Sequence, residues 1–203
     1  MKSTLRILAA LAPLLLAACA PQQLVRNKGD AASLAQQEAR EQQLADANHW
    51  TLQGRLFVIN GQQSDGPGTL TWTQDGDHYD FTLRAPITGK SFRLTGGPDG
   101  AVLEGLEGGT QRGSDAESLM RRALGWDVPL DELRAWVLGV RAKGATAELS
   151  FGDDKLLSLL QQDGWAVSYS AWDTKRQPPL PTRVFAEKPP YKVKLAIESW
   201  IVQ

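Results

Sequence analysis

GTLTWTQDGDHYDFTLRA, residues 68–85, alternates apolar with polar residues on both sides of an Asp-Gly turn. Leu70 and Trp72 precede the turn at alternate positions, and three large apolar residues follow it in the same pattern. Because successive side chains of a strand point to opposite faces, all five fall on one face. The stretch therefore predicts an antiparallel hairpin with one strongly hydrophobic face, which another part of the chain must cover.

The period of two continues on both sides of this hairpin. Glycine, proline, aspartate and asparagine separate the segments before residue 107, as is typical of consecutive antiparallel hairpins. Beyond the hairpin itself, strands are expected at residues 50–59, 91–95, 101–106, 147–151, 156–162, 165–172, 182–186 and 193–202.

Two helical segments interrupt the strands. Residues 114–125 begin with Ser114 and Glu117, spaced as in a capping box, and end at Gly125. Residues 130–138 form a second short helix with apolar residues on one side. We expect both helices to cover the hydrophobic face, so the fold class is α+β: a strongly curved antiparallel sheet with helices packed into its concave side.

A third helix is expected near the N-terminus, at residues 30–47. Asp30 is a suitable N-cap, and good helix formers follow it. Because this segment is polar and rich in alanine, we expect it on the outside of the fold.

The N-terminus has the order of a secretory signal. Lys2 and Arg6 precede an apolar run over residues 7–16, which is too short to span about 30 Å of hydrocarbon. Leu16-Ala17-Ala18 then precede Cys19, the only cysteine, which has no partner for an intramolecular disulfide. The alternative is an ordinary signal peptide followed by an incidental free thiol.

This arrangement resembles the lipobox of bacterial lipoproteins. The resemblance implies removal of residues 1–18, an S-diacylglycerol and an N-acyl chain on Cys19, and no other cofactor. Ala20 stands where an aspartate would retain an enteric lipoprotein in the inner membrane, so the outer membrane is favoured. Residues 19–30 are then a lipidated tether, and residues 31–203 are a single domain facing the periplasm.

Composition argues against nucleic acid binding and catalysis. The formal net charge is −1 without basic clusters, so no nucleic acid partner is expected. His49 and His78 are the only histidines, and they lack metal-ligand spacing. Asp153 and Asp154 follow Gly152 and are better explained as a turn than as a catalytic pair. We expect neither a metal nor an enzyme.

Several segments, in order along the chain, resemble the outer-membrane lipoprotein receptor LolB family. They are WTLQGRL at 50–56, APITG at 85–89, GWDVPL at 125–130 continuing to Gly139, QDGW at 162–165 continuing to Tyr169, and KVKL at 192–195 with Trp200. The resemblance implies an unclosed β-barrel, lidded by helices, whose hydrophobic cavity holds the acyl chains of another lipoprotein. It also implies a monomer that accepts lipoproteins from the periplasmic carrier LolA and inserts them among outer-membrane phospholipids.

Two groups of residues are candidates for this role. Pro86, Ile87 and Gly89 match the family's protruding loop, in which an aliphatic residue delivers cargo to the membrane; the alternative is that Ile87 folds back into the core. Arg55 matches the family's Gly-Arg pair and is interpreted as structural. The second group is the set of large apolar residues expected to line the acyl-chain cavity, although packing within a filled core explains each of them equally well. They are Trp72, Phe81, Leu83, Leu119, Trp126, Trp136 and Tyr169.

Two other functions remain open from the sequence. The first is a lipoprotein subunit of an envelope assembly machine, which would have a filled interior and an exposed docking edge. The second is an anchored enzyme of envelope glycans or lipids, which would need a polar cleft with paired carboxylates.

Overall fold

The computed structural model of the protein describes residues 24–61, 63–85 and 91–202. The expected signal peptide and Cys19 lie outside these residues, as do Pro86, Ile87 and Gly89 of the expected insertion loop.

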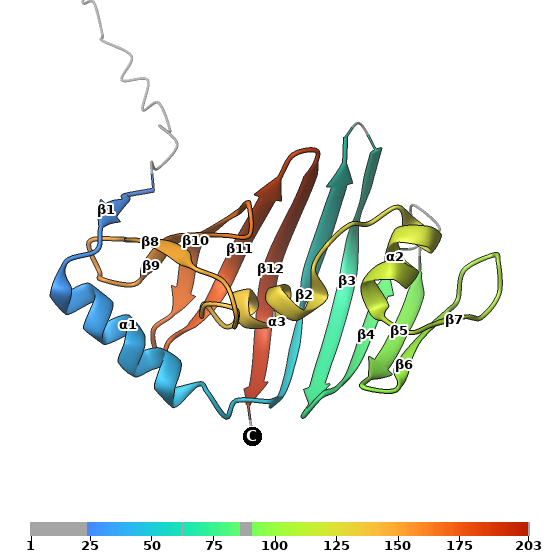
Figure 1. Cartoon of the computed structure of the whole chain (residues 1–203), viewed down its shortest axis with the longest axis horizontal. Coiled ribbons are helices and arrows are strands. Elements are labelled where there is room, and N and C mark those ends of the chain that lie inside the picture. Colours follow the sequence, from blue (N-terminus) through green and yellow to red (C-terminus); the bar gives the residue numbers. More distant parts are fainter. Residues whose placement is uncertain (1–23, 62, 86–90, 203) are drawn as a thin grey trace, which may run out of the picture.

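A single antiparallel sheet forms the body of the molecule (Figure 1). Its spatial order is β1-β8-β9-β10-β11-β12-β2-β3-β4-β5-β6-β7, so β1 and β7 are its edges and the sheet is unclosed. The predicted curved antiparallel sheet is thereby confirmed. The strands are β1 (Asn27–Lys28), β2 (His49–Asn60), β3 (Gln63–Asp75), β4 (His78–Arg84), β5 (Phe92–Gly97), β6 (Gly100–Glu104), β7 (Gln111–Gly113), β8 (Ala147–Phe151), β9 (Leu157–Gln162), β10 (Trp165–Asp173), β11 (Leu180–Lys188) and β12 (Tyr191–Val202).

The predicted hairpin is β3–β4, with Leu70 opposite Leu83 and Trp72 opposite Phe81. All four side chains are buried on the concave face. The chain turns at Gly76, whose φ of +59° suits glycine. Strand β12 returns to pair with β2 along its whole length, so the last strand lies beside the first long one in the middle of the sheet.

One glycine in the middle of the sheet is required by close backbone approach. Gly54 of β2 lies opposite Ile197, next to the register shift between Ile197 and Ser199 on β12. A Cβ atom at Gly54 would lie 2.2 Å from the carbonyl oxygen of Ala196. Only a residue without a side chain lets β2 and β12 pair at this point.

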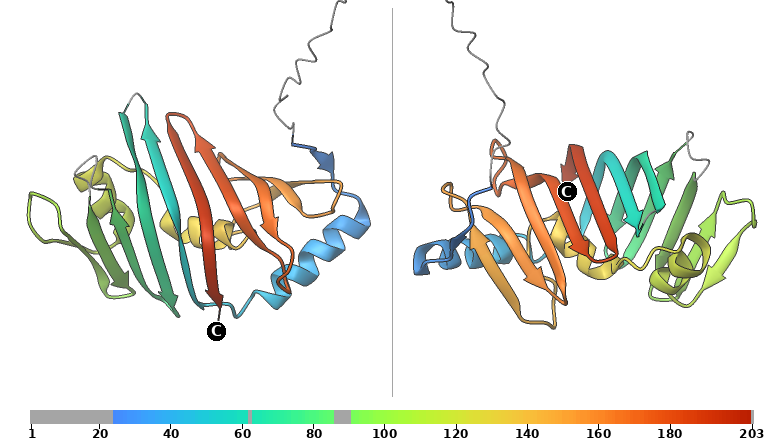
Figure 2. Two further views of the ribbon diagram at one scale, coloured as in Figure 1. Left: turned by 180° about the vertical axis from the view of Figure 1, so that it is seen from behind. Right: turned by 90° about the horizontal axis from the view of Figure 1, so that it is seen from above.

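Helices α2 (Ala116–Leu124) and α3 (Leu130–Val137) lie against the concave face, as expected (Figures 1 and 2). Helix α2 ends at Gly125, which has a left-handed conformation. The expected capping box is wrong, because Asp115 and not Ser114 is the N-cap and accepts the Ser118 N–H at 2.7 Å.

Helix α1 (Ala31–Gln43) is capped by Asp30 as predicted, and most of its residues are exposed, as expected for a helix on the outside of the fold. The one unexpected feature is that the face it packs inward is polar, since Ser33, Gln37 and Arg40 are buried. Ahead of it, β1 pairs with β8 within the segment expected to be a tether. The buried apolar residues, from Leu44 to Trp200, form one continuous core.

Candidate functional site

Aromatic rings form a continuous path across the concave face. Neighbouring centroids along it are 5.2 to 6.1 Å apart, and most contacts are edge to face, the geometry that aromatic pairs favour. The alternation of β12, β2, β3, β4 and β5 points one ring from each strand inward, and the α2–α3 connection adds the last ring. In order, the path is Trp200, Trp50, Trp72, Phe81, Phe92 and Trp126.

All seven residues proposed from the sequence as cavity lining lie buried in this one core. Three lie on β3 and β4, and Trp136 of α3 faces Tyr169 of β10, whose hydroxyl donates to the Trp136 carbonyl at 3.0 Å. Burial raises the pKa of Tyr169, so it remains a neutral donor. Because these side chains contact one another, an acyl chain would have to displace helices or side chains to lie among them.

Two indole groups in the aromatic path are buried without a hydrogen-bond partner among the described residues. These are the Nε1 atoms of Trp50 and Trp72, whose rings are 5.2 Å apart. Leaving a buried donor unpaired costs about 1–3 kcal/mol, so such groups call for an explanation. An ester or amide carbonyl of a bound lipid would satisfy them. Alternation in the sequence places both rings inside but gives no sign that their N–H groups are free.

Helix α3 is held at both ends by side chains from other helices. At its N-terminus, Pro129 provides no side-chain cap, and Glu117 of α2 accepts the Leu130 N–H at 3.0 Å instead. At its C-terminus, the Arg40 guanidinium of α1 donates to the carbonyl oxygens of Leu138 and Gly139. The cover of the sheet is therefore fixed by polar contacts that the sequence did not predict.

Arg40 also links this junction to the loop before β11. Its guanidinium donates to the Pro179 carbonyl at 2.8 and 3.1 Å and lies 4.8 Å from the Trp172 ring centroid. Burial lowers its pKa to about 10, which still leaves it charged at neutral pH. Carbonyl oxygens at the end of α3 stabilise the cation because a helix C-terminus carries partial negative charge.

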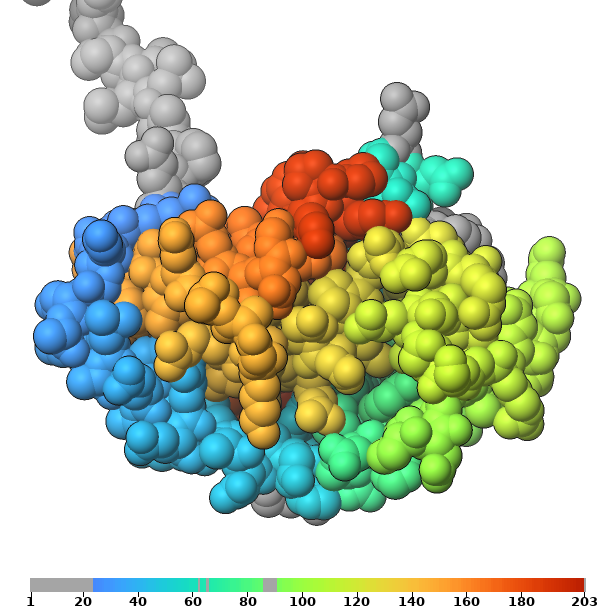
Figure 3. Space-filling view, in the orientation of Figure 1, coloured from blue at the N-terminus to red at the C-terminus, as the bar shows by residue number. Residues whose placement is uncertain are grey.

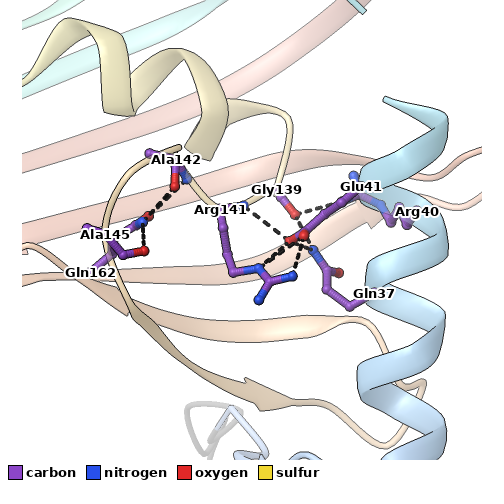
Figure 4. A network of polar contacts seen from close by, with 8 residues as sticks. All are labelled: Gln37, Arg40, Glu41, Gly139, Arg141, Ala142, Ala145 and Gln162. Atoms are coloured by element: carbon purple, nitrogen blue, oxygen red, sulfur yellow. Dashed lines mark hydrogen bonds and ion pairs between the residues drawn. The ribbon is translucent and has the colours of Figure 1, made fainter. Parts of the chain in front are cut away.

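The segment after α3 is held by a second set of polar contacts (Figure 4). Glu41 of α1 pairs with Arg141 at 2.6 Å. Although burial acts to raise the pKa of Glu41, hydrogen bonds from Arg141 and Gln37 lower it overall. On the sheet side, the Gln162 amide accepts the Ala142 N–H and donates to the Ala142 carbonyl.

A hollow of about 910 Å³ opens on the helix side, between α1, α2 and α3 (Figure 3). Its rim includes Asp115, Glu117, Asp131 and Glu132, which come from two separate helical segments. Burial together with Asp131 and Asp115 raises the pKa of Tyr79 on this rim to about 12. We call these four carboxylates the acidic rim. The sequence did not reveal it, because the two segments meet only in the fold.

The proposed insertion loop is bounded by described residues at the other end of the sheet. Ala85 is buried, and its N–H donates to the Ser91 hydroxyl at 3.0 Å across the base of the loop. The same end carries the β2–β3 and β11–β12 turns, where the Gly61 N–H donates to the Pro190 carbonyl at 3.1 Å. The hollow instead adjoins the β3–β4 turn at Asp77, so it lies toward the opposite end (Figure 1).

Within the described residues, no group of three His, Cys, Asp or Glu side chains is placed to hold a metal ion. No helix in that part of the chain is long and apolar enough to cross a bilayer.

An open antiparallel sheet with an apolar concave face under helices is a fold that this chain shares with solved structures. The structure matches a LolA superfamily protein from Nitrosomonas europaea with a TM-score of 0.52 at 10% identity, over 84% of this chain and 93% of that one. A DUF1329 family protein from Desulfovibrio piger matches equally well, with a TM-score of 0.52 at 9% identity, covering 85% of this chain and 92% of that one. At such identities the likeness concerns the fold alone.

The sequence identifies the family. The family model "Outer membrane lipoprotein LolB" matches residues 48–200. Relatives named outer-membrane lipoprotein LolB are 38% identical in Xanthomonas axonopodis pv. citri, over 84% of this chain and 81% of the relative, and 34% identical in Pseudomonas syringae pv. syringae, over 92% and 90%. The chain belongs to the LolB family of outer-membrane lipoproteins, as its motifs predicted.

Proposed function

We propose that this protein is anchored in the outer membrane through Cys19, accepts acylated lipoproteins from the periplasmic carrier LolA, and inserts them into the inner leaflet of that membrane. The observation that carries the proposal is the aromatic concave face of an unclosed sheet, covered by helices, in a chain of the LolB family.

Such a surface suits the physical problem of moving an acylated protein through water. Each methylene of an acyl chain gains roughly 0.8 kcal/mol on leaving water, so a triacylated cargo needs continuous shelter. Transfer without nucleotide hydrolysis requires an affinity above that of the carrier and below that of the bilayer. Flat aromatic rings offer large apolar area with few torsions to immobilise.

The acidic rim is the proposed contact for a basic carrier. It borders the hollow that leads toward the covered face, so docking there would bring the two apolar surfaces together. Complementary charge at such a contact raises the rate of association and sets orientation more than it raises affinity.

Cargo exchange tests the proposal directly. Unacylated mature chain, residues 19–203 with Cys19→Ser, is mixed with a LolA–lipoprotein complex, and the two proteins are then separated. We expect the acylated cargo to elute with this chain. Cargo that stays on the carrier would instead favour a lipoprotein scaffold that holds no acyl chains.

The delivery step is tested at the proposed insertion loop. The Ile87→Glu variant is expected to fold and accept cargo but to leave it bound when outer-membrane vesicles are added, because a charged tip resists the hydrocarbon boundary. Ile87→Leu, which keeps an aliphatic tip, is the control and should deliver cargo at the wild-type rate. Wild-type delivery by Ile87→Glu would remove the loop from the mechanism.

A further inference from the structure

A row of basic residues crosses the convex face of the sheet, opposite the helices. Register places Arg183 of β11 beside Ala196 of β12, Ala196 beside Arg55 of β2, Arg55 beside Thr69 of β3, and Thr69 beside Arg84 of β4. All three arginines are exposed. Since neighbouring strands are about 4.8 Å apart, the arginines are spaced at intervals of roughly 10 Å.

The next row toward the β11–β12 turn adds a lysine between two aromatic rings. Lys194 lies opposite Phe57 on one side and Phe185 on the other, and its ammonium is 5.9 and 5.6 Å from their ring centroids. Both rings are partly exposed. This gives the face apolar area directly beside its positive charge. We call Arg55, Arg84, Arg183, Lys194 and the two rings the cationic face.

Little acidic charge offsets this face. Glu198 is the acidic neighbour of Arg55, and their contact is loose, with atoms 3.5 Å apart and both side chains about 60% exposed. Glu187 is occupied by Lys192 at 3.0 Å. The face is thus positive in a protein whose formal net charge is −1.

The centre of the cationic face is hollowed and continues toward the N-terminal segment. A shallow groove of about 400 Å³ lies around Ala196, whose small side chain stands between Arg55 and Arg183. Phe185 and Ser170 line both this groove and a second one of about 450 Å³ that Leu24 and Arg26 border. Arg26 donates to the Ser168 hydroxyl at 3.2 Å, which fixes the N-terminal segment on the convex side.

The length of the tether limits how far this side can be from the bilayer. Leu24 comes five positions after Cys19, and five steps of fully extended chain span at most about 18 Å. A lipid anchor at Cys19 therefore keeps the N-terminal segment, and the convex groove it borders, within that distance of the headgroups. Figure 2 shows this face in its left view, with the N-terminal segment beside the sheet.

From the charge, the rings and the tether together, we propose that the cationic face is a docking surface for anionic phospholipid headgroups. Arginine and lysine bind the phosphates, while Phe57 and Phe185 lie at the headgroup level. The domain then rests with its convex side against the bilayer and its helix side, with the hollow, available to the carrier. This inference rests on the proposed anchoring at Cys19.

Vesicle binding by the unacylated mature chain tests the surface without the anchor. The probes are phosphatidylcholine vesicles with and without phosphatidylglycerol. We expect binding only to the anionic vesicles, weakening with added salt. Each basic residue near an anionic surface favours binding about fivefold, so Arg55→Gln/Arg183→Gln/Lys194→Gln should bind on the order of 100-fold more weakly.

A matched variant separates the surface from net charge alone. Arg112, Lys143 and Lys175 are exposed residues away from the groove, and their joint change to glutamine removes the same charge. This control should keep wild-type binding. Equal loss in both variants, equal binding to both vesicle types, or binding to soluble heparin without vesicle binding would each overturn the proposal.

Cargo exchange in solution distinguishes this inference from the proposed function. The neutralised variant should still accept cargo from LolA, because its substitutions lie on the face opposite the aromatic path. Normal exchange with unchanged vesicle binding would refute the cationic face alone, whereas absent exchange in the wild type would refute the receptor function.

Discussion

Trp50 and Trp72 meet edge to face, with ring centroids 5.2 Å apart, and both bury an indole N–H that has no acceptor in the described structure. Their neighbour Trp200, 5.5 Å from Trp50, is different because its N–H donates to the Pro181 carbonyl at 3.0 Å. Two unpaired donors side by side are therefore a cost to the folded protein.

This contrast gives a prediction for two matched substitutions. Trp72→Phe removes ring volume together with an unpaired donor, so the two effects offset and stability should stay within about 1 kcal/mol of wild type. Trp200→Phe removes a paired donor and should cost roughly 2 kcal/mol more. Chemical denaturation measures both, and equal losses would show that the Trp72 N–H is satisfied.

Trp72→Phe should also weaken the binding of acylated cargo. If the Trp72 N–H donates to a lipid carbonyl, Trp72→Phe loses about 1 kcal/mol of binding, or roughly fivefold in affinity for acylated cargo. Competition between wild type and variant for one labelled lipoprotein measures this ratio. Equal affinities of wild type and variant would show that Trp72 contributes only apolar contact to cargo binding.

A backbone prediction concerns the centre of the sheet. Gly54→Ala places a Cβ atom 2.2 Å from the Ala196 carbonyl oxygen, so β2 and β12 must separate, at a cost of about 3 kcal/mol. Gly108→Ala is the control, since its Cβ would lie 3.4 Å from the Gln111 side chain. Thermal unfolding should show a large loss for the first and almost none for the second.

Arg40 is expected to stabilise the fold through the hydrogen bonds that it donates to backbone carbonyls. Arg40→Met removes the guanidinium donor from the carbonyls of Leu138 and Pro179 and leaves the Gly139 carbonyl with only the Gln37 amide, at a cost of about 3 kcal/mol, or a fall in Tm of roughly 6–12 °C. Arg40→Lys keeps the positive charge but not the several N–H donors of the guanidinium, so its stability should lie between those of wild type and Arg40→Met. A Met variant as stable as wild type would contradict this role.

The acidic rim gives a pH-dependent prediction. Burial, followed by Glu132, raises the pKa of Glu117, so its charged form is disfavoured in the folded state. A raised carboxyl pKa favours folding at low pH, and this contribution is lost as pH rises through the folded value. Glu117→Gln should therefore be more stable than wild type at neutral pH, with the gain disappearing in acid.

The size of that gain is small because Glu117 is partly exposed. Glutamine retains an acceptor for the Leu130 N–H, so only the charge is lost. After solvent screening we expect no more than about 0.5 kcal/mol, or roughly 1–2 °C in Tm. Melting curves at several pH values provide the test, and a pH-independent difference would argue against a charge effect.

The fold was largely predictable because its strands obey a period of two and its covering helices carry apolar stripes. Trp72 and Phe81 could be placed on one face from their spacing alone. The buried polar face of helix α1 could not be predicted in this way. Gln37 and Arg40 are buried because they bind backbone carbonyls of residues about a hundred positions away. A polar residue in a sequence therefore indicates an exposed side chain only when the fold places no buried hydrogen-bond acceptor beside it.

The candidate site was predictable only in its apolar part. The spacing of Trp136 and Tyr169 suggests burial, but the bond between the Tyr169 hydroxyl and the Trp136 carbonyl depends on how α3 crosses the sheet. Likewise, Asp115 and Asp131 form a common rim only after α2 and α3 fold back together. Long-range geometry of this kind leaves no local pattern in the chain.

The sheet ends in free edges at β1 and β7 instead of joining them. A closed barrel has a fixed circumference, and enlarging it means breaking a seam of backbone hydrogen bonds. Here the two margins can spread apart while every ladder between them stays intact. Under the proposed function, capacity would then be an elastic property of the molecule, and we expect cargoes with short and long fatty tails to be held at a similar cost in free energy.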